Sequence, residues 1–269
     1  MSALEKLTEP NLTMRKRVVS LDVSVIGYQQ AIVQVIELGE AHISSYACFS
    51  NVHMTIEAKN SPEFQEMVNK ATFTFPDGMP LVFALRMLYG IKQDRIAGMD
   101  FMQDILRAGN NRQTSIFLFG STPEILDGLK SYLNKNFPLI KLVGALSPPF
   151  RTLSEKENTD IVDEINSSKA NLVFVGLGCP KQEIWMAKNS ANITATLLGV
   201  GGAFEIYAGK AKRSPNWMQR MGLEWLYRLG QEPRRLFKRY TITNTRFIYF
   251  LTKDFFLQLK VKALNENSI

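Results

Sequence analysis

The chemistry in this sequence is concentrated in four segments, each of which places small or polar residues directly after an apolar run. An open α/β sheet binds its ligands at this position, beyond the carboxyl ends of its strands. In the segment 73–80, Asp77 stands between Pro76 and Gly78. A carboxylate held there can accept a proton inside a cleft. The alternative is that Asp77 only caps the following helix, which an isolated Asp-Gly pair favours.

A second segment, 48–53, supplies uncharged polar groups. Ser50 and Asn51 follow its apolar run and can hydrogen-bond a ligand. His53, one of two histidines in the chain, titrates near neutral pH, but a histidine is more often a structural polar residue than a catalyst. We therefore predict ligand binding for Ser50 and Asn51 and a structural role for His53.

Two glycine turns complete the set. In 172–183 an apolar strand runs through a Gly-x-Gly turn that contains Gly178 into a helix starting near Pro180, with Lys181 and Gln182 in its first turn. Free backbone N–H groups and the positive helix end then face one spot, which suits a phosphate. The third glycine of a dinucleotide fingerprint is missing, which argues against NAD.

The second glycine turn follows the apolar run that ends at Leu198. Gly201 and Gly202 would let the backbone approach a nucleotide closely, and Glu205 can accept hydrogen bonds from a ribose or base. The alternative for both glycines is a plain tight turn. Isolated histidines, the lack of a cysteine pair and the lack of Asp-x-Asp argue against a bound metal. Leaving-group charge then has to be stabilised by helix ends and by Arg or Lys.

These segments require an α/β scaffold. At 269 residues, 45% of them hydrophobic, the chain can bury one substantial core. Apolar runs alternate with helical segments, which predicts a Rossmann-like, largely parallel sheet flanked by helices, with a helical C-terminal appendage. The predicted strands are 18–23, 45–50, 71–75, 115–119, 140–143, 172–175 and 194–198. The predicted helices are 28–38, 61–70, 79–89, 100–108, 123–136, 154–166 and 181–188. The predicted helix caps are Ser61 with Pro62, Ser121 with Pro123, and Ser154 with Glu157.

The chain divides into a polar, flexible tail (1–17), a catalytic core (18–209) and a basic appendage (210–269). Residues 210–262 contain thirteen Lys and Arg against three Asp and Glu, whereas the rest of the chain contains nineteen against twenty-two. The anionic partner is therefore expected at the appendage, whether nucleic acid, a phospholipid surface or a diphosphate. Cys48 and Cys179 lie far apart in apolar runs, which predicts free thiols in a reducing cytosol.

The appendage ends in a long amphipathic segment. Arg239, Arg246, Lys253 and Lys260 recur at every seventh position, so on a continuous helix they line one face. A basic stripe beside a wide apolar face suits a helix that lies at a membrane surface. The alternative is a helix packed on the domain with its charges solvated. No apolar run reaches the roughly 18 residues that a membrane span needs.

The chemical segments together resemble the WecG/TagA/CpsF family of glycosyltransferases, and the resemblance extends from about residue 18 to residue 240. Its five blocks, in order, are Pro76–Gly78, Arg95–Asp100, Gly176–Glu183, Gly199–Phe204 and Glu224–Leu229. The resemblance implies an inverting, metal-independent transfer from a UDP-sugar, often UDP-N-acetylmannosamine or its uronic acid, to an undecaprenyl-diphosphate-linked sugar in cell-surface polysaccharide synthesis. The UDP-sugar is a substrate, so no cofactor is implied.

The resemblance also implies roles for individual residues. Asp77 would deprotonate the acceptor hydroxyl, in agreement with its strand-end position. The implied donor site comprises Ser50, Asn51, Arg95, Gly178, Lys181, Gln182, Gly201, Gly202 and Glu205, the last of which is usually Asp in the family. The appendage would close over the site and stabilise the departing diphosphate through Arg213, Arg228, Arg235, Lys238 and Arg239.

One departure from the family pattern concerns the sugar. Phe49 stands where the family commonly has Thr, so a hydroxyl near the sugars is lost unless Ser50 replaces it. The donor, a hexose or an N-acetylhexosamine, therefore stays open, as do the acceptor glycan, the linkage and the oligomeric state, which includes a homo-oligomer. We expect a cytoplasmic protein on the inner face of the cell membrane, without a nucleic-acid partner. The alternatives are a nucleotide-cofactor oxidoreductase and a non-catalytic module that binds membrane or nucleic acid.

Overall fold

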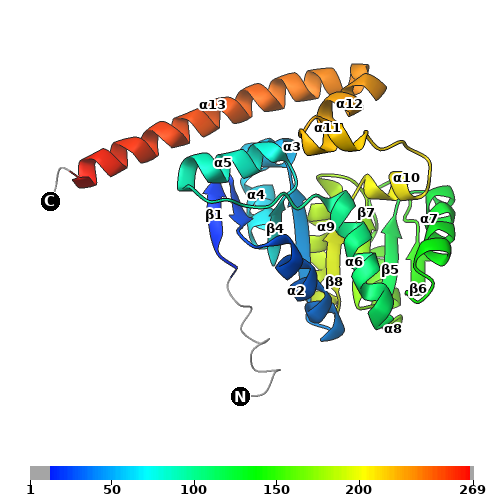
Figure 1. Ribbon diagram of the computed structural model, residues 1–269. Helices are drawn as coiled ribbons and strands as arrows, with labels where there is room; N and C mark the ends of the chain where they lie inside the picture. The colour runs from blue at the N-terminus through cyan, green and yellow to red at the C-terminus, as the bar shows by residue number, and fades with distance from the viewer. Residues whose placement is uncertain (1–12, 267–269) are drawn as a thin grey trace, which may run out of the picture.

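A six-stranded parallel sheet forms the centre of the protein in a computed structural model that describes residues 13–266 (Figure 1). Every strand pair in this sheet is parallel, and the strand order is β4-β3-β8-β7-β5-β6. The strands are β3 (Ser45–Ser50), β4 (Phe73–Pro76), β5 (Ser115–Gly120), β6 (Lys141–Leu146), β7 (Leu172–Gly176) and β8 (Thr196–Gly199). The predicted fold class is confirmed, and the strand boundaries shift by a few residues.

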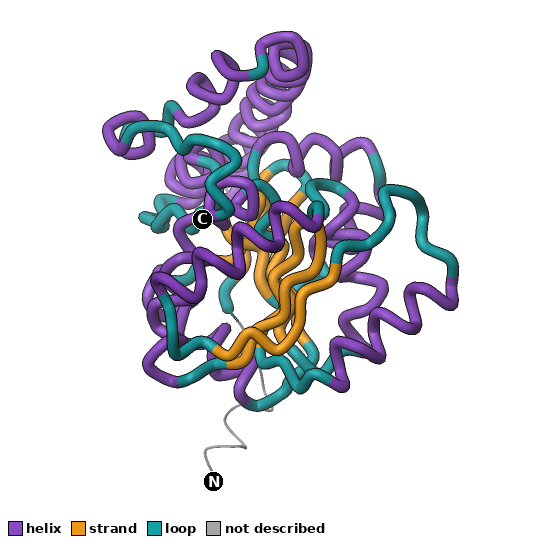
Figure 2. Tube along the Cα trace, turned by 90° about the vertical axis from the view of Figure 1, so that its right-hand side faces the viewer, coloured by secondary structure: helices purple, strands orange, loops and turns teal. Residues whose placement is uncertain are grey.

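Helices cover both faces of the sheet, which is seen nearly edge-on in Figure 2. One face carries α2 (Tyr28–Glu40), α6 (Gly98–Arg112), α7 (Pro123–Asn136) and α10 (Ala203–Tyr207). The other carries α3 (Val52–Asn60), α4 (Pro62–Asn69), α5 (Met79–Tyr89), α8 (Glu155–Ser167) and α9 (Lys181–Asn189). Because alternate residues of a strand point to opposite faces, Cys48 joins the second core and Ala47 and Phe49 join the first.

The predicted strand 18–23 is wrong. The chain forms a separate antiparallel hairpin of β1 (Arg15–Val18) and β2 (Leu21–Ser24), and Val19 in its turn has a φ of 57°. Apolar residues continue through this turn, so the hydrophobic pattern shows no break between the two strands. β1 begins inside the range predicted as a flexible tail, of which residues 1–12 lie outside the described part of the chain. Ser24 Oγ accepts a hydrogen bond from Thr74 N at 3.0 Å, which places the hairpin beside β4.

Local signals decided most helix starts. Ser61 caps α4, and Ser154 with Glu157 forms the predicted capping box of α8. The predicted Ser121 cap is wrong, because Ser121 has a φ of 64° and Thr122 caps α7 instead. Helix α3 was not predicted, since its sequence has little amphipathic pattern, and its N-cap is Asn51.

The appendage forms α11 (Asn216–Arg220), α12 (Glu224–Gln231) and the long α13 (Pro233–Glu266), which crosses over α3 and α5 (Figure 1). Leu236 and Phe247 of α13 are buried, and Arg246 donates to Asn60 Oδ1 at 2.7 Å. The helix therefore packs on the domain along one side.

Arg239, Arg246, Lys253 and Lys260 all lie on the continuous helix α13, as the predicted basic stripe requires, but they differ in exposure. Arg239 and Arg246 are half-buried beside the packed side, whereas Lys253 and Lys260 are exposed. Beside these lysines, α13 also exposes many large apolar side chains: Phe237, Ile242, Ile248, Tyr249, Phe256, Leu257, Leu259, Val261 and Leu264. None of the described helices combines the length and the apolar character that crossing a membrane requires.

Candidate active site

The four segments singled out by sequence meet at one edge of the sheet. Their strands β4, β3, β8 and β7 are consecutive neighbours and run in the same direction, so their carboxyl ends lie side by side. Ser50 pairs with Pro76, and Gly199 pairs with Cys48 and with Val175. Parallel pairing thus brings together loops that are far apart in sequence, such as those that follow Ser50 and Gly199.

Asp77 follows β4 directly and is held by its backbone. Its N–H donates to Ser50 O at 2.8 Å, and the next N–H, of Gly78, donates to the same oxygen at 3.3 Å. The N-cap of α5 is Gly78, and no side chain among the described residues caps this helix. The helix-cap alternative for Asp77 is therefore wrong, which leaves its carboxylate, 28% exposed, available for chemistry.

The environment of Asp77 suits a base. Burial raises the pKa of its carboxyl to about 6, against the opposing effects of Arg95 and Arg228, while Glu224 and Asp100 raise it further. A carboxylate with this pKa is mostly ionised at pH 7 and accepts a proton more readily than an ordinary aspartate.

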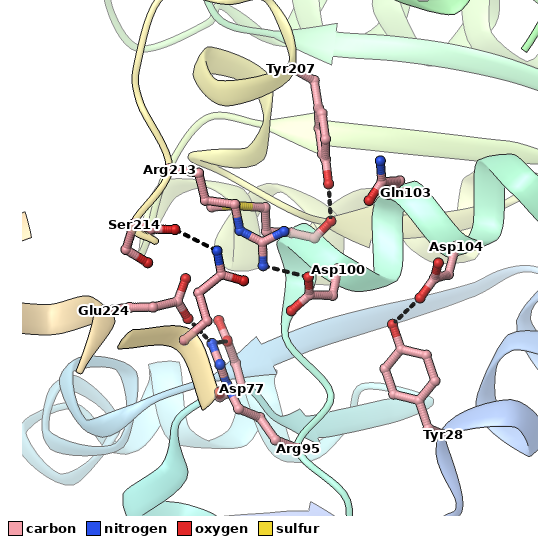
Figure 3. A network of polar contacts seen from close by, with 12 residues as sticks. Tyr28, Asp77, Arg95, Asp100, Gln103, Asp104, Tyr207, Arg213, Ser214 and Glu224 are labelled. Carbon is pink, nitrogen blue, oxygen red and sulfur yellow. Dashed lines mark hydrogen bonds and ion pairs between the residues drawn. The ribbon is translucent and has the colours of Figure 1, made fainter. Parts of the chain in front are cut away.

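Arg95 connects the core to the appendage at this point (Figure 3). Its Nε donates to the backbone oxygen of Asp77 at 2.6 Å, and its Nη2 lies 3.6 Å from Asp77 Oδ1. The same Nη2 donates a hydrogen bond to Glu224 Oε2 at the start of α12. Asp77 therefore lies where the appendage meets the sheet.

A second ion pair also links the appendage to the core. Arg213 pairs with Asp100 in the first turn of α6 (Figure 3). Arg213 Nε is buried and has no hydrogen-bond partner among residues 13–266. Nearby, Tyr207 donates to Met99 O at 2.9 Å. The Arg95–Glu224 and Arg213–Asp100 pairs thus hold the segment after Gly209 against the core near Asp77.

The two glycine turns are joined by one side chain. Gln182 Oε1 accepts from Gly178 N at 3.1 Å, and its Nε2 donates to Gly199 O at 2.8 Å. Gly178 and Gly201 have φ angles of 77° and 48°, where a side chain would strain the backbone. No described atom lies within 4 Å of the position that a Cβ would take at Gly178. The turns are thus fixed in shape, with open space at Gly178.

Comparison with known proteins agrees with this arrangement. Residues 16–261 match the profile of the Glycosyl transferase WecG/TagA/CpsF family. A relative, N-acetylglucosaminyldiphosphoundecaprenol N-acetyl-beta-D-mannosaminyltransferase of Bacillus subtilis (strain 168), is 30% identical over 187 residues, which cover 69% of this chain and 71% of the relative. The chain belongs to the WecG/TagA/CpsF family of glycosyltransferases. The predicted resemblance and enzyme class are confirmed, and the oxidoreductase and non-catalytic alternatives are dropped.

In this glycosyltransferase, the side chains of several predicted donor-site residues form hydrogen bonds to other groups of the protein. Ser50 is fully buried and its hydroxyl faces Met54 Sδ at 3.3 Å, so it is turned away from the loops. Asn51 Oδ1 accepts from Met54 N as the cap of α3. Gln182 is buried, and both ends of its amide contact backbone groups. Lys181 and Glu205 are exposed at the starts of α9 and α10.

Phe49 does not lie in the site of the transferase. Its ring packs between Phe75 and Phe101, with centroids 5.5 and 5.4 Å away, and a Cβ on Gly98 would come within 3.1 Å of it. The substitution relative to the family pattern therefore falls in the core beneath the site. The expected loss of a hydroxyl near the sugars stays a prediction; the Phe49 side chain lies on the face of β3 opposite to that of Cys48.

The predicted appendage cations are spread out. Arg228 and Lys238 are both exposed, and Arg228 lowers the pKa of Asp77 electrostatically. The Arg239 guanidinium lies 5.5 Å from the centre of the Tyr240 ring, and together with burial it lowers the pKa of His53. The side chain of Arg235 lies outside the described part of the chain. Within that part, no three His, Cys, Asp or Glu side chains gather as metal ligands.

Sequence reasoning assigned no role to three acidic residues of the transferase. Glu224 and Asp100 form the two links to the appendage, and Glu183 is completely buried below the Gly178 turn. Burial raises the pKa of Glu183 to about 7, although hydrogen bonds from Gln182 and Cys179 oppose this. All three lie inside blocks that carried the family resemblance, which was the signal that could have found them.

Proposed function

We propose that this glycosyltransferase moves a hexose or N-acetylhexosamine from a UDP-sugar to a sugar carried on undecaprenyl diphosphate, with inversion and without a metal ion. The observation that carries this proposal is the Asp77 carboxylate, which has a pKa near 6, follows β4 at the same sheet edge as the two glycine turns, and lies next to Arg95 where Glu224 of the appendage binds it. The name of the Bacillus subtilis relative, an N-acetylglucosaminyldiphosphoundecaprenol N-acetyl-beta-D-mannosaminyltransferase, supports the class of acceptor and an N-acetylhexosamine as the transferred sugar.

The proposed reaction is a direct displacement. Asp77 takes the proton from the acceptor hydroxyl as its oxygen bonds to the anomeric carbon of the donor, and the bond from that carbon to the UDP oxygen breaks. One displacement inverts the configuration of that carbon. The leaving UDP retains its electron pair, and the proton stays on Asp77 until solvent removes it.

The charge that develops on UDP needs cations or backbone dipoles. We propose that the Gly178 turn and the start of α9 bind the donor phosphates, as sequence predicted, while Arg228 and Arg213 approach from the appendage. Both arginines lie on the segment that is held to the core by the Arg95–Glu224 and Arg213–Asp100 pairs. The role of Lys238, Arg239 and Arg235 at the diphosphate stays a prediction.

We further propose that the appendage binds the inner face of the cell membrane, where a polyprenyl-linked acceptor resides. The support is the set of large apolar side chains that α13 exposes, with Phe237 65% and Phe256 62% exposed, together with exposed Trp217 and Met221 at α11. Exposed lysines of α13, Lys253 and Lys260, would accompany these apolar side chains near anionic lipid headgroups.

The test is a panel of UDP-sugars incubated with a short-chain lipid-diphosphate N-acetylglucosamine acceptor and analysed by mass spectrometry, with and without EDTA. We expect one donor to extend the acceptor by a single sugar with inverted linkage, equally in both conditions. Absence of transfer from every UDP-sugar would refute the donor class, and loss of transfer in EDTA that Mg²⁺ restores would refute metal independence.

A further inference from the structure

One nitrogen of Arg95 is shared between two carboxylates. Nη2 donates a hydrogen bond to Glu224 Oε2 and lies 3.6 Å from Asp77 Oδ1 (Figure 3). Arg95 Nε is bound separately to the backbone oxygen of Asp77 at 2.6 Å. That second bond keeps the guanidinium beside Asp77 whatever Glu224 does. Glu224 therefore decides only which carboxylate the outer end of Arg95 contacts.

We propose that Glu224 is a positioning residue that holds the Arg95 guanidinium off the Asp77 carboxylate and so keeps Asp77 an effective base. This inference rests on the proposed function, because it requires Asp77 to accept the proton. A guanidinium in close contact with a carboxylate stabilises its ionised form and weakens it as a base. With Nη2 engaged by Glu224, the contact to Asp77 stays longer than a hydrogen bond.

The charges around Asp77 single out Glu224. The charged side chains that act on it are Arg95 before α6, Asp100 in α6, and Glu224 and Arg228 in α12. Burial is the main cause of its raised pKa, the two arginines lower it, and the two acidic residues raise it. Asp100 pairs with Arg213 of the appendage, whereas Glu224 pairs with Arg95. Both acidic residues also raise the pKa of Arg95, but of the two it is Glu224 that accepts a hydrogen bond from the Arg95 guanidinium.

The appendage places Glu224 beside Arg95. It is the first residue of α12, and its side chain is 15% exposed. The preceding turn is fixed against the core, because a Cβ on Gly222 would lie 2.8 Å from Met79 Cγ at the start of α5. Met79 is two residues from Asp77. The position of α12 on the core thus determines whether the Arg95 guanidinium beside Asp77 is hydrogen-bonded to Glu224.

The experiment is the pH dependence of single-turnover transfer by full-length Glu224→Gln. The amide keeps the length and an accepting oxygen but removes the charge, so Arg95 can move to Asp77. We expect the acidic limb to shift to lower pH by on the order of one unit, because the substitution removes a negative charge that raises the pKa of Asp77 and lets Arg95 approach from 3.6 Å to hydrogen-bond distance. The plateau rate should fall severalfold, with KM for the donor nearly unchanged, because a weaker base transfers the proton less effectively.

Matched variants separate this from a structural effect. Glu224→Asp, which retains the charge, should restore much of the limb position, and Glu232→Gln, which removes another α12-side carboxylate, should leave it unchanged. In an Arg95→Gln background the shift caused by Glu224→Gln should shrink, because its indirect part is lost. Should Glu224→Gln fail to fold, Arg95→Gln alone tests the idea, and we expect its acidic limb to move to higher pH.

The outcomes distinguish the two proposals. If Asp77→Asn retains near-normal turnover, Asp77 is not the base and the proposed function and this inference both fail. If Asp77→Asn is inactive but Glu224→Gln keeps the wild-type limb, only the role of Glu224 is overturned. An equal Glu224→Gln shift with and without Arg95 would overturn the action through Arg95.

Discussion

Asp77 is the residue on which most of the chemistry depends. Removing its charge with Asp77→Asn should lower turnover by about 10²–10⁴-fold, the usual contribution of a general base. UDP binding should persist, because the phosphate-suited turns are formed by Gly178 and Gln182 rather than by Asp77. Release of UDP in the presence of acceptor measures the first effect and calorimetric titration the second. Near-normal turnover would remove Asp77 from the mechanism.

The same residue makes a prediction about stability. Folding raises the pKa of Asp77 from 3.8 to about 6, mainly by burial, so the folded protein binds this proton more tightly than the unfolded chain. Stability contributed by this group is therefore present at low pH and is lost as pH rises from about 4 to 6. Asp77→Asn, which stays neutral, should raise Tm relative to wild type at pH 8, and the difference should vanish near pH 4. A higher wild-type Tm at pH 8 would contradict the raised pKa.

At the scale of elements, one side of α13 packs on the domain and the other side faces solvent. The packed side carries Phe247, which is 3% exposed and belongs to the core cluster that contains the buried residues of α3 and α5. The opposite side carries Phe237, Ile248 and Phe256, all exposed. Burial of one side explains why the helix stays on the domain, and the other side is available for the proposed membrane contact.

These two sides can be separated by substitution. Replacing Phe237, Ile248 and Phe256 together with Ser should weaken binding to anionic liposomes while leaving Tm nearly unchanged, because no buried contact is lost. Phe247→Ala is the matched control and should lower the free energy of unfolding by about 3–5 kcal/mol. Liposome co-sedimentation and thermal unfolding measure the two effects. Unchanged sedimentation of the triple variant would count against the membrane proposal.

At the scale of the whole molecule, catalysis is predicted to require both parts of the chain. A protein ending at Gly209 lacks Arg213, Glu224 and Arg228, and thus both ion pairs to the core. It should lose transfer to a lipid acceptor, measured by mass spectrometry, and also liposome binding. Because the truncation uncovers the packing surface of α13, circular dichroism must first show a folded core. Full activity of a folded truncated protein would refute the closing role of the appendage.

The features of the fold that could be predicted from the sequence are those that neighbouring residues determine. The strand-end positions of Asp77, Gly178 and Gly201 followed from short apolar runs and turn residues, which are local signals. The hairpin at Val19 and the cap at Thr122 were missed, since an apolar run continues through the first and two cap residues compete at the second. Ser50 was predicted to face a ligand, but its hydroxyl is buried against Met54. The face to which a strand side chain points depends on strand register, which the spacing of residues in the sequence does not provide.

The sequence by itself determined that this protein is an α/β glycosyltransferase with a basic C-terminal appendage, because periodicity, turn chemistry and ordered motifs are carried by neighbouring residues. Only the tertiary structure decided that Arg95 meets Glu224 beside Asp77, that Phe49 faces the core and that α13 exposes many of its large apolar side chains. Arg95 and Glu224 are 129 residues apart, and their contact depends on how sheet, helices and appendage pack together. Such contacts follow from the packing of the whole chain, which local pattern does not encode.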